Sequence, residues 1–180
     1  MSKDKIIKWA MPHIKSFRCY IDVGAHDGDT SVPFVETFTK VYAFEPNPTT
    51  FDKIPENIYK YNFALADTAG YIDLVIPGNT KNPEHGSTSK RRNKNWVGET
   101  FQVQMTTLDS FNFSDVDFIK IDVEQGELEV VKGAMLTIKK YKPTIMFENK
   151  RNENDLVIDI LTDIGYTIEK HKSDTVAFFG

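Results

Sequence analysis

Short apolar runs alternate with amphipathic stretches along this chain of 180 residues. The apolar runs have the length and the β-branched or aromatic content of strands, and the stretches between them carry apolar residues at helical spacing. The predicted strands are 19–23, 41–44, 61–65, 71–76, 101–105, 116–123, 143–147, 166–171 and 175–179. The predicted helices are 30–38, a short helix opening at 47–50, 127–140 and 155–164.

This order of elements predicts a single α/β domain over residues 1–180. Strands that alternate with helices form a parallel sheet with right-handed crossovers, and the closing hairpin makes the last strand antiparallel to the rest. Residues 1–18 are predicted to be a helical lead-in that packs on the sheet. We expect residues 77–100 to be a long polar loop near the functional site, since a loop of this length inside a compact domain is usually functional or disordered.

Composition narrows the class of protein. Hydrophobic residues make up 40% of the chain and aromatic residues 12%, which is typical of a globular protein. The net charge of -4 gives no overall attraction to nucleic acid or an acidic membrane, so we expect neither as a partner. A single cysteine, Cys19, excludes a disulfide framework, and no ligand spacing predicts a metal site. We expect a cytoplasmic protein, because the first residues lack an apolar signal core and no run reaches membrane-spanning length.

A glycine turn, Asp-Val-Gly-Ala-His-Asp-Gly, follows the first predicted strand. A turn that binds a dinucleotide needs three glycines, so that the backbone can approach a pyrophosphate at the helix N-terminus. Gly24 and Gly28 are present, but His26 occupies the middle position. Histidine tolerates a positive φ, so the turn survives while close approach of a phosphate is hindered. The turn therefore favours a nucleoside ligand without phosphates, such as S-adenosylmethionine.

An acidic residue at the end of the second predicted strand strengthens the nucleoside prediction. Glu45 is placed to accept hydrogen bonds from a ribose diol, since ligands in open α/β sheets bind beyond the carboxyl ends of the strands. The amide groups of the glycine turn would meet the carboxylate of S-adenosylmethionine, and Asp22 or Asp27 would meet its ammonium group. Two alternatives stay open at this point: an enzyme that binds NAD or a nucleotide sugar, and a nucleoside-binding module without catalysis.

Six segments together resemble the FkbM-type family of class I S-adenosylmethionine-dependent methyltransferases. They are 21–28 (Ile-Asp-Val-Gly-Ala-His-Asp-Gly), 43–48 (Ala-Phe-Glu-Pro-Asn-Pro), 62–70 (Asn-Phe-Ala-Leu-Ala-Asp, then Gly), 106–110 (Thr-Thr-Leu-Asp-Ser), 118–124 (Phe-Ile-Lys-Ile-Asp-Val-Glu) and 127–134 (Glu-Leu-Glu-Val-Val-Lys-Gly-Ala). Their order and spacing carry the resemblance over most of the chain. One departure is that Gln125 separates Asp-Val-Glu from the glycine, Gly126, that usually follows directly.

The resemblance implies a fold, a cofactor and an activity. The fold is a Rossmann-like class I methyltransferase fold, with a seven-stranded mostly parallel sheet, its last strand antiparallel, and helices on both faces. The cofactor is S-adenosyl-L-methionine, which leaves as S-adenosyl-L-homocysteine. The activity is O-methylation of a hydroxyl on a saccharide or other small metabolite, and this acceptor class rests on the resemblance alone. The sequence names neither the acceptor nor the oligomeric state.

Site residues follow from these expectations. Two acids at the end of the strand 116–123, Asp122 and Glu124, are the candidates for a catalytic base. The cofactor-binding candidates are Asp22, Gly24, Ala25, His26, Gly28, Thr30, Glu45, Pro46, Asn62, Ala64 and Asp122. The substrate-binding candidates are His85, Ser87, Ser89, Glu124 and Glu148.

Overall fold

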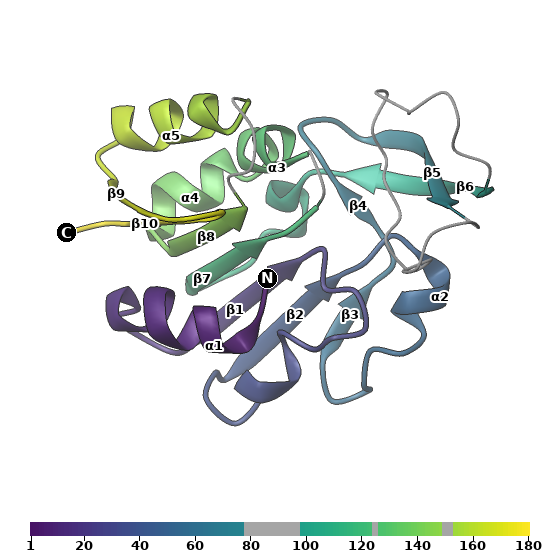
Figure 1. The fold of residues 1–180 in the computed structure, drawn as a ribbon, viewed down its shortest axis with the longest axis horizontal. Helices are drawn as coiled ribbons and strands as arrows, with labels where there is room; N and C mark the ends of the chain where they lie inside the picture. Colours follow the sequence, from purple (N-terminus) through teal and green to yellow (C-terminus); the bar gives the residue numbers. More distant parts are fainter. Residues whose placement is uncertain (78–97, 124–125, 149–152) are drawn as a thin grey trace.

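The computed structural model describes residues 1–77, 98–123, 126–148 and 153–180. A seven-stranded sheet crosses the molecule in the order β3-β2-β1-β7-β8-β10-β9 (Figure 1). Its strands are β1 (Cys19–Val23), β2 (Lys40–Phe44), β3 (Tyr59–Tyr61), β7 (Val116–Ile121), β8 (Thr144–Glu148), β9 (Thr167–His171) and β10 (Asp174–Phe178). Strand β10 is antiparallel to both of its neighbours, and the other neighbouring pairs are parallel. The predicted fold class is confirmed.

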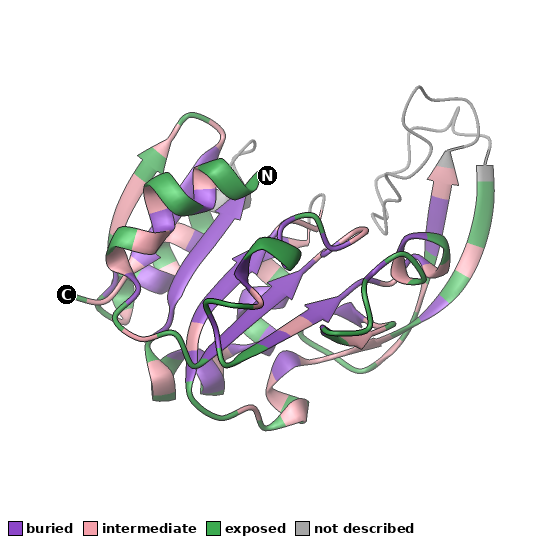
Figure 2. Ribbon diagram, turned by 90° about the horizontal axis from the view of Figure 1, so that it is seen from below, coloured by how far each residue is buried: buried purple, intermediate pink, exposed green. Residues whose placement is uncertain are grey.

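Helical segments cover both faces of this sheet. Helices α3 (Glu127–Gly133), α4 (Met135–Tyr141) and α5 (Glu153–Asp163) pack on one face through a cluster that includes Val131, Ile138 and Leu161. The N-terminal segment and the stretch around α2 (Pro48–Phe51) cover the other face. Strands β1 and β8 are therefore buried at every position, as Figure 2 shows for the centre of the sheet. In the parts of the chain that are described, no helix has the length and apolar character needed to cross a membrane.

The lead-in is helical, in three short pieces. These are α1 (Lys3–Lys5), the π-helical η1 (Ile6–Ala10) and the 3₁₀ helix η2 (Met11–His13). Lys5 Nζ pairs with Asp174 at 2.6 Å, and the Trp9 ring stacks on His171 with centroids 4.6 Å apart. The lead-in is thus attached to the β9–β10 hairpin.

The predicted helix over 30–38 is wrong in its extent. The structure forms one 3₁₀ turn there, η3 (Val32–Phe34), followed by turns. A proline disfavours the α conformation of the residue before it, here Val32, within the first turn of the predicted helix. The apolar residues that suggested a helix, Phe34 and Phe38, are still buried against the sheet. The burial pattern was right, and the backbone conformation was not.

The predicted strand over 61–65 is two strands in two different sheets. Strand β3 ends at Tyr61, and β4 (Ala64–Leu65) belongs to a second sheet with β5 (Gly70–Pro77) and β6 (Gly98–Thr106), in the order β4-β6-β5. Asn62 separates them, and its Nδ2 donates to the Glu45 carbonyl at 2.7 Å and the Pro46 carbonyl at 3.1 Å. The side chain of Asn62 thus ties the chain to the end of β2 at the point where it leaves the large sheet.

The predicted helix over 127–140 is divided at Ala134, where φ is -110° and ψ is 5°. The Asp109 carboxylate accepts hydrogen bonds from the backbone N–H of Leu136 at 2.9 Å and of Thr137 at 2.8 Å. An acid at this position satisfies backbone donors that a new helix would otherwise leave without an acceptor. The break therefore depends on a distant residue that the local periodicity does not reveal.

Candidate functional site

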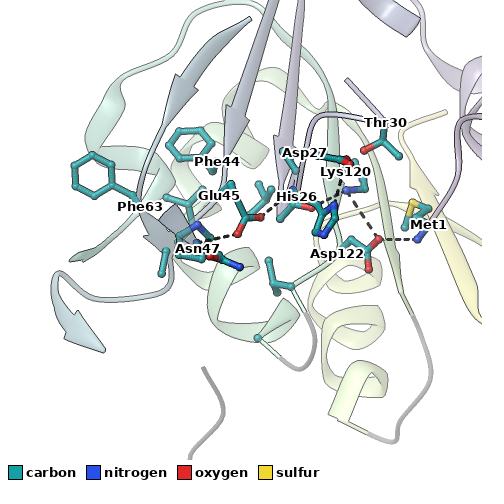
Figure 3. Close-up of a pocket in the computed structure, with 18 of the residues that line it drawn as sticks. Met1, His26, Asp27, Thr30, Phe44, Glu45, Asn47, Phe63, Lys120 and Asp122 are labelled. Atoms are coloured by element: carbon teal, nitrogen blue, oxygen red, sulfur yellow. Dashed lines mark hydrogen bonds and ion pairs between the residues drawn. The ribbon is translucent and has the colours of Figure 1, made fainter. Parts of the chain in front are cut away.

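A cavity of about 360 Å³ lies at the carboxyl ends of β1, β2 and β7 (Figure 3). Its volume is in the range of small-molecule sites, and its position is the one where open α/β sheets bind ligands. It brings together most of the predicted site residues that are described. The predicted residues among its lining are Gly24, Ala25, His26, Asp27, Thr30, Glu45, Pro46, Ala64, Asp122 and Glu148.

The glycine turn approaches the neighbouring strand closely. Gly24 has φ of +77°, and a Cβ built on it would overlap the Asp122 carbonyl oxygen and lie 2.9 Å from the carbonyl carbon. His26 has φ of +56°, so histidine does take up the left-handed conformation at the middle position. The amides of Gly24 and Ala25 donate to the Phe44 carbonyl, at 2.9 and 3.1 Å. Those amides are therefore engaged within the protein, which corrects the expectation that they face a ligand carboxylate.

Glu45 is held rigidly at the end of β2. Its Oε2 accepts from the His26 amide at 2.8 Å, and its Oε1 accepts from the Asn47 amide at 2.9 Å. The residue is 8% exposed, and burial raises its pKa although the two amide hydrogen bonds oppose this effect. Asn47 in turn begins α2, because its Oδ1 accepts from the Thr49 amide at 3.0 Å. Both carboxylate oxygens are thus oriented before any ligand arrives, with lone pairs left to accept hydroxyl groups.

A buried ion pair lies beneath the glycine turn. Lys120 Nζ is 2.7 Å from Asp22 Oδ1, and the two side chains are 2% and 0% exposed. The second oxygen, Asp22 Oδ2, accepts from the hydroxyls of Thr30 at 2.7 Å and Ser31 at 2.6 Å. Burial by itself lowers the pKa of Lys120, but the carboxylates of Asp22 and Asp122 together outweigh this effect and the pKa is raised. Lys120 is therefore charged, and Asp22 lies under the floor of the cavity rather than among its lining.

The other acids meet at the end of the cavity away from Glu45. Asp122 follows β7, is 16% exposed in its side chain, and pairs with the Met1 amine at 2.7 Å. Lys120 Nζ is 3.9 Å from the same Asp122 oxygen. Glu148 ends β8 and is 8% exposed. Figure 3 shows Met1, Lys120 and Asp122 gathered on one side of His26, with Glu45, Phe44 and Phe63 on the other.

Two further predicted site residues, Gly28 and Asn62, are described and lie outside the cavity lining. Gly28 is behind the turn, where a Cβ would meet Pro55 at 3.4 Å and Ile54 at 3.7 Å. Asn62 holds the backbone of residues 45–46 and is not among the residues lining the cavity. Glu124, His85, Ser87 and Ser89 lie outside the described residues. Among the described residues, no group of three or more His, Cys, Asp or Glu side chains is placed to hold a metal ion.

The sequence analysis did not predict two parts of the cavity lining, namely its apolar residues, which we call the apolar wall, and Lys120. Phe44, Leu65 and Leu74 line the cavity, and Leu74 comes from the second sheet, whose position no local pattern specified. Lys120 also lines it. The one available signal for Lys120 was a charged residue between two apolar neighbours, Ile119 and Ile121, in a strand predicted to be buried, because lysine is almost never fully buried unless it is paired.

Three comparisons place the chain among known proteins. The family model described as "Methyltransferase FkbM domain" matches residues 22–168. The hexuronic acid methyltransferase AglP of Haloferax volcanii is 31% identical over 125 residues, which are 62% of this chain and 48% of AglP. The methyltransferase sdnD of Sordaria araneosa is 26% identical over 152 residues, 63% of this chain and 59% of sdnD. The chain thus spans about half the length of the curated relatives that it matches.

The fold matches as well. The crystal structure of methyltransferase FkbM from Methylobacillus flagellatus superposes with a TM-score of 0.67 at 15% identity, covering 99% of this chain and 48% of that one. The seven-stranded order and the antiparallel β10 agree with this likeness. Since the family model covers most of the chain, the chain belongs to the family of FkbM methyltransferase domains.

Proposed function

We propose that this domain binds S-adenosylmethionine in the described cavity and transfers its methyl group to a hydroxyl of a saccharide or similar small metabolite. The observation that supports S-adenosylmethionine as the donor is the position of Glu45. Its buried carboxylate is fixed by hydrogen bonds from two backbone amides at the edge of the cavity. Phe44, Leu65 and Leu74 supply apolar surface beside it for a base. The acceptor class is supported by the similarity to AglP, whose name gives hexuronic acid as its substrate.

The residues of the cavity fit this donor better than a dinucleotide. Acidic side chains line the cavity at Asp27, Asp29, Asp122 and Glu148, and they would repel a pyrophosphate. The same carboxylates favour a ligand that carries a sulfonium and an ammonium. In addition, the amides of Gly24 and Ala25 already donate to Phe44, so they are not available to a phosphate. This arrangement argues against the NAD alternative.

When bound, S-adenosylmethionine supplies an electrophilic methyl group, so the protein needs to orient the donor, exclude water and accept a proton from the acceptor. Glu45 would accept hydrogen bonds from the ribose, and the apolar wall would hold the adenine. Asp122 would take the proton of the acceptor hydroxyl as general base, since it ends the central strand β7 and reaches the cavity. Glu148, close by at the end of β8, would bind the acceptor. Glu124 keeps its proposed role in catalysis and substrate binding.

Calorimetric titration with S-adenosylmethionine, S-adenosylhomocysteine and NAD tests the donor. Binding of the first two without NAD supports the proposal and justifies an acceptor screen, in which hexuronic acids are compared with neutral sugars. Binding of NAD alone would overturn it. Donor binding without methyl transfer to any acceptor would instead favour a nucleoside-binding module without catalysis.

Replacing Glu45 with glutamine should weaken S-adenosylhomocysteine binding about tenfold to a hundredfold. Both carboxylate oxygens accept from backbone amides, so the amide group of glutamine would face one of those N–H donors. A hydrogen bond to a charged group contributes about 1.5–3 kcal/mol, which corresponds to that loss. Titration of the variant measures it, with Glu36→Gln as the control because Glu36 is exposed and is not among the residues that line the cavity. Unchanged affinity in Glu45→Gln would remove the ribose assignment.

Replacing Asp122 with asparagine should lower turnover more than it lowers donor affinity. A positioned base contributes about 10²–10⁴-fold to rate, and asparagine keeps the size of the side chain while losing its basicity. Steady-state kinetics on the acceptor found by the screen, together with donor titration, separates the two effects. Asp52→Asn on the exposed surface is the matched control. A turnover equal to that of the wild type would show that Asp122 is not the base.

A further inference from the structure

Lys120, one of the residues that line the cavity, joins the ends of two strands. Its ammonium is 2.7 Å from Asp22 Oδ1 and 3.1 Å from the Gly24 carbonyl oxygen, both at the end of β1. It is also 3.9 Å from Asp122 Oδ2, at the end of its own strand β7. The side chain is 2% exposed, so these contacts are made almost without water. This buried cation therefore links the start of the glycine turn to the Asp122 carboxylate, whose closer cationic partner is the Met1 amine at 2.7 Å.

A counterion role toward Asp22 does not account for all of this geometry. The Asp22 carboxylate already accepts hydrogen bonds from the hydroxyls of Thr30 and Ser31. Lys120 reaches past Asp22 to the Gly24 carbonyl and toward Asp122, and Gly24, Lys120 and Asp122 all line the cavity. A buried network in which each member has several partners holds its groups in one arrangement.

The position of Lys120 in the cavity indicates which part of a ligand it affects. Glu45 and Phe44, the groups proposed for the nucleoside, lie on one side of His26 in Figure 3, and Lys120 and Asp122 lie on the other. The side of Lys120 and Asp122 is also where the carbonyl of Gly24 and the Asp122 carboxylate offer acceptors. In S-adenosylmethionine, the part that hydrogen-bond acceptors of this kind would bind is the ammonium group of the amino-acid tail.

We propose that Lys120 is a positioning residue for the amino-acid tail of the donor. It holds the Gly24 carbonyl and the Asp122 carboxylate at a fixed separation on two strands, so that the tail is recognised while the nucleoside is bound independently by Glu45 and the apolar wall. This inference rests on the proposed function, because it assumes that S-adenosylmethionine is the donor.

The test compares two ligands that differ in the tail alone. S-adenosylhomocysteine carries the amino-acid tail, and 5′-methylthioadenosine has the same nucleoside and sulfur without it. In the variant Lys120→Met, the dissociation constant for S-adenosylhomocysteine should rise at least tenfold, whereas that for 5′-methylthioadenosine should change less than twofold. Lys40→Met, at an exposed position of β2, is the control and should bind both ligands like the wild type.

A double variant separates positioning from charge balance. Lys120→Met alone leaves the buried Asp22 carboxylate without its counterion, which is strongly destabilising. Asp22→Asn combined with Lys120→Met removes both charges, and a folded double variant should still show the tail-selective loss. Thermal unfolding confirms the folded state of each protein before titration, and the double variant decides the question if the single one does not fold.

Three results would overturn the proposal. They are unchanged S-adenosylhomocysteine binding in folded Lys120→Met, recovery of that binding in the double variant, and an equal loss of both ligands. Failure of the wild type to bind either ligand would instead contradict the proposed function, so the two failures are distinguishable.

Discussion

Replacing Gly24 with alanine should destabilise the domain by about 2–5 kcal/mol and abolish measurable binding of S-adenosylhomocysteine. Gly24 has φ of +77°, and a left-handed conformation costs a residue with a Cβ about 1–2 kcal/mol. The Cβ would also overlap the backbone carbonyl of Asp122, and inserting an atom into a packed site costs about 1–3 kcal/mol more. The Cβ would meet backbone atoms, which cannot rotate away as a side chain can. The strands β1 and β7 therefore have to separate at the edge of the cavity.

Chemical denaturation measures the loss of stability, and calorimetry measures the loss of binding. The matched control is Gly28→Ala, since Gly28 also has a positive φ of +89° but its Cβ would meet the Pro55 side chain at 3.4 Å, an ordinary contact. That variant should lose about 1–2 kcal/mol from backbone strain alone. If the two variants lose equal stability, the close approach of Gly24 to β7 is not what requires a glycine there.

The large sheet could be predicted because each of its strands is recognisable from its own local sequence pattern. Buried parallel strands such as β1 and β8 are short continuous apolar runs, and each was found within one or two residues. The antiparallel β10 followed from the hairpin pattern at the end of the chain. Errors came where the backbone depends on distant groups: Asp109 divides the helix at Ala134, and the Asn62 side chain accompanies the change from one sheet to the other.

The sequence predicted the residues at the strand ends around the candidate site, but not the contacts among the buried residues below them. Glu45 was found because an acid at a strand end beside a glycine turn is a local pattern, and the structure does place it at the cavity. Asp22 belongs to the same pattern, yet it lies beneath the cavity and binds Lys120 of the lining, because this pair joins positions 98 residues apart. The contact between the Met1 amine and Asp122 spans 121 residues and has no local signal at all.

Replacing Gly133 with alanine should destabilise the domain by about 1–3 kcal/mol, although the same change inside an exposed helix stabilises by up to about 1 kcal/mol. Gly133 is the last residue of α3, and a Cβ there would overlap the carbonyl oxygen of Ala66 and lie 2.8 Å from its carbon. Ala66 follows β4, whose residues Ala64 and Leu65 line the cavity. Pushing α3 away should therefore also weaken nucleoside binding.

Denaturation and titration with 5′-methylthioadenosine measure the two consequences together. Gly126→Ala, at the other end of α3, is the control for the denaturation measurement alone, because Gly126 and Val123 themselves line the cavity; the nearest atom to its Cβ is the side-chain tip of Val123 at 3.3 Å, which can move. Its cost should be about 1 kcal/mol or less, from the N-cap preference alone. A stabilised Gly133→Ala variant would mean that the gain in helix propensity exceeds the cost of the contact with the Ala66 backbone. In that case α3 can move away from Ala66, and its position does not determine the shape of the cavity.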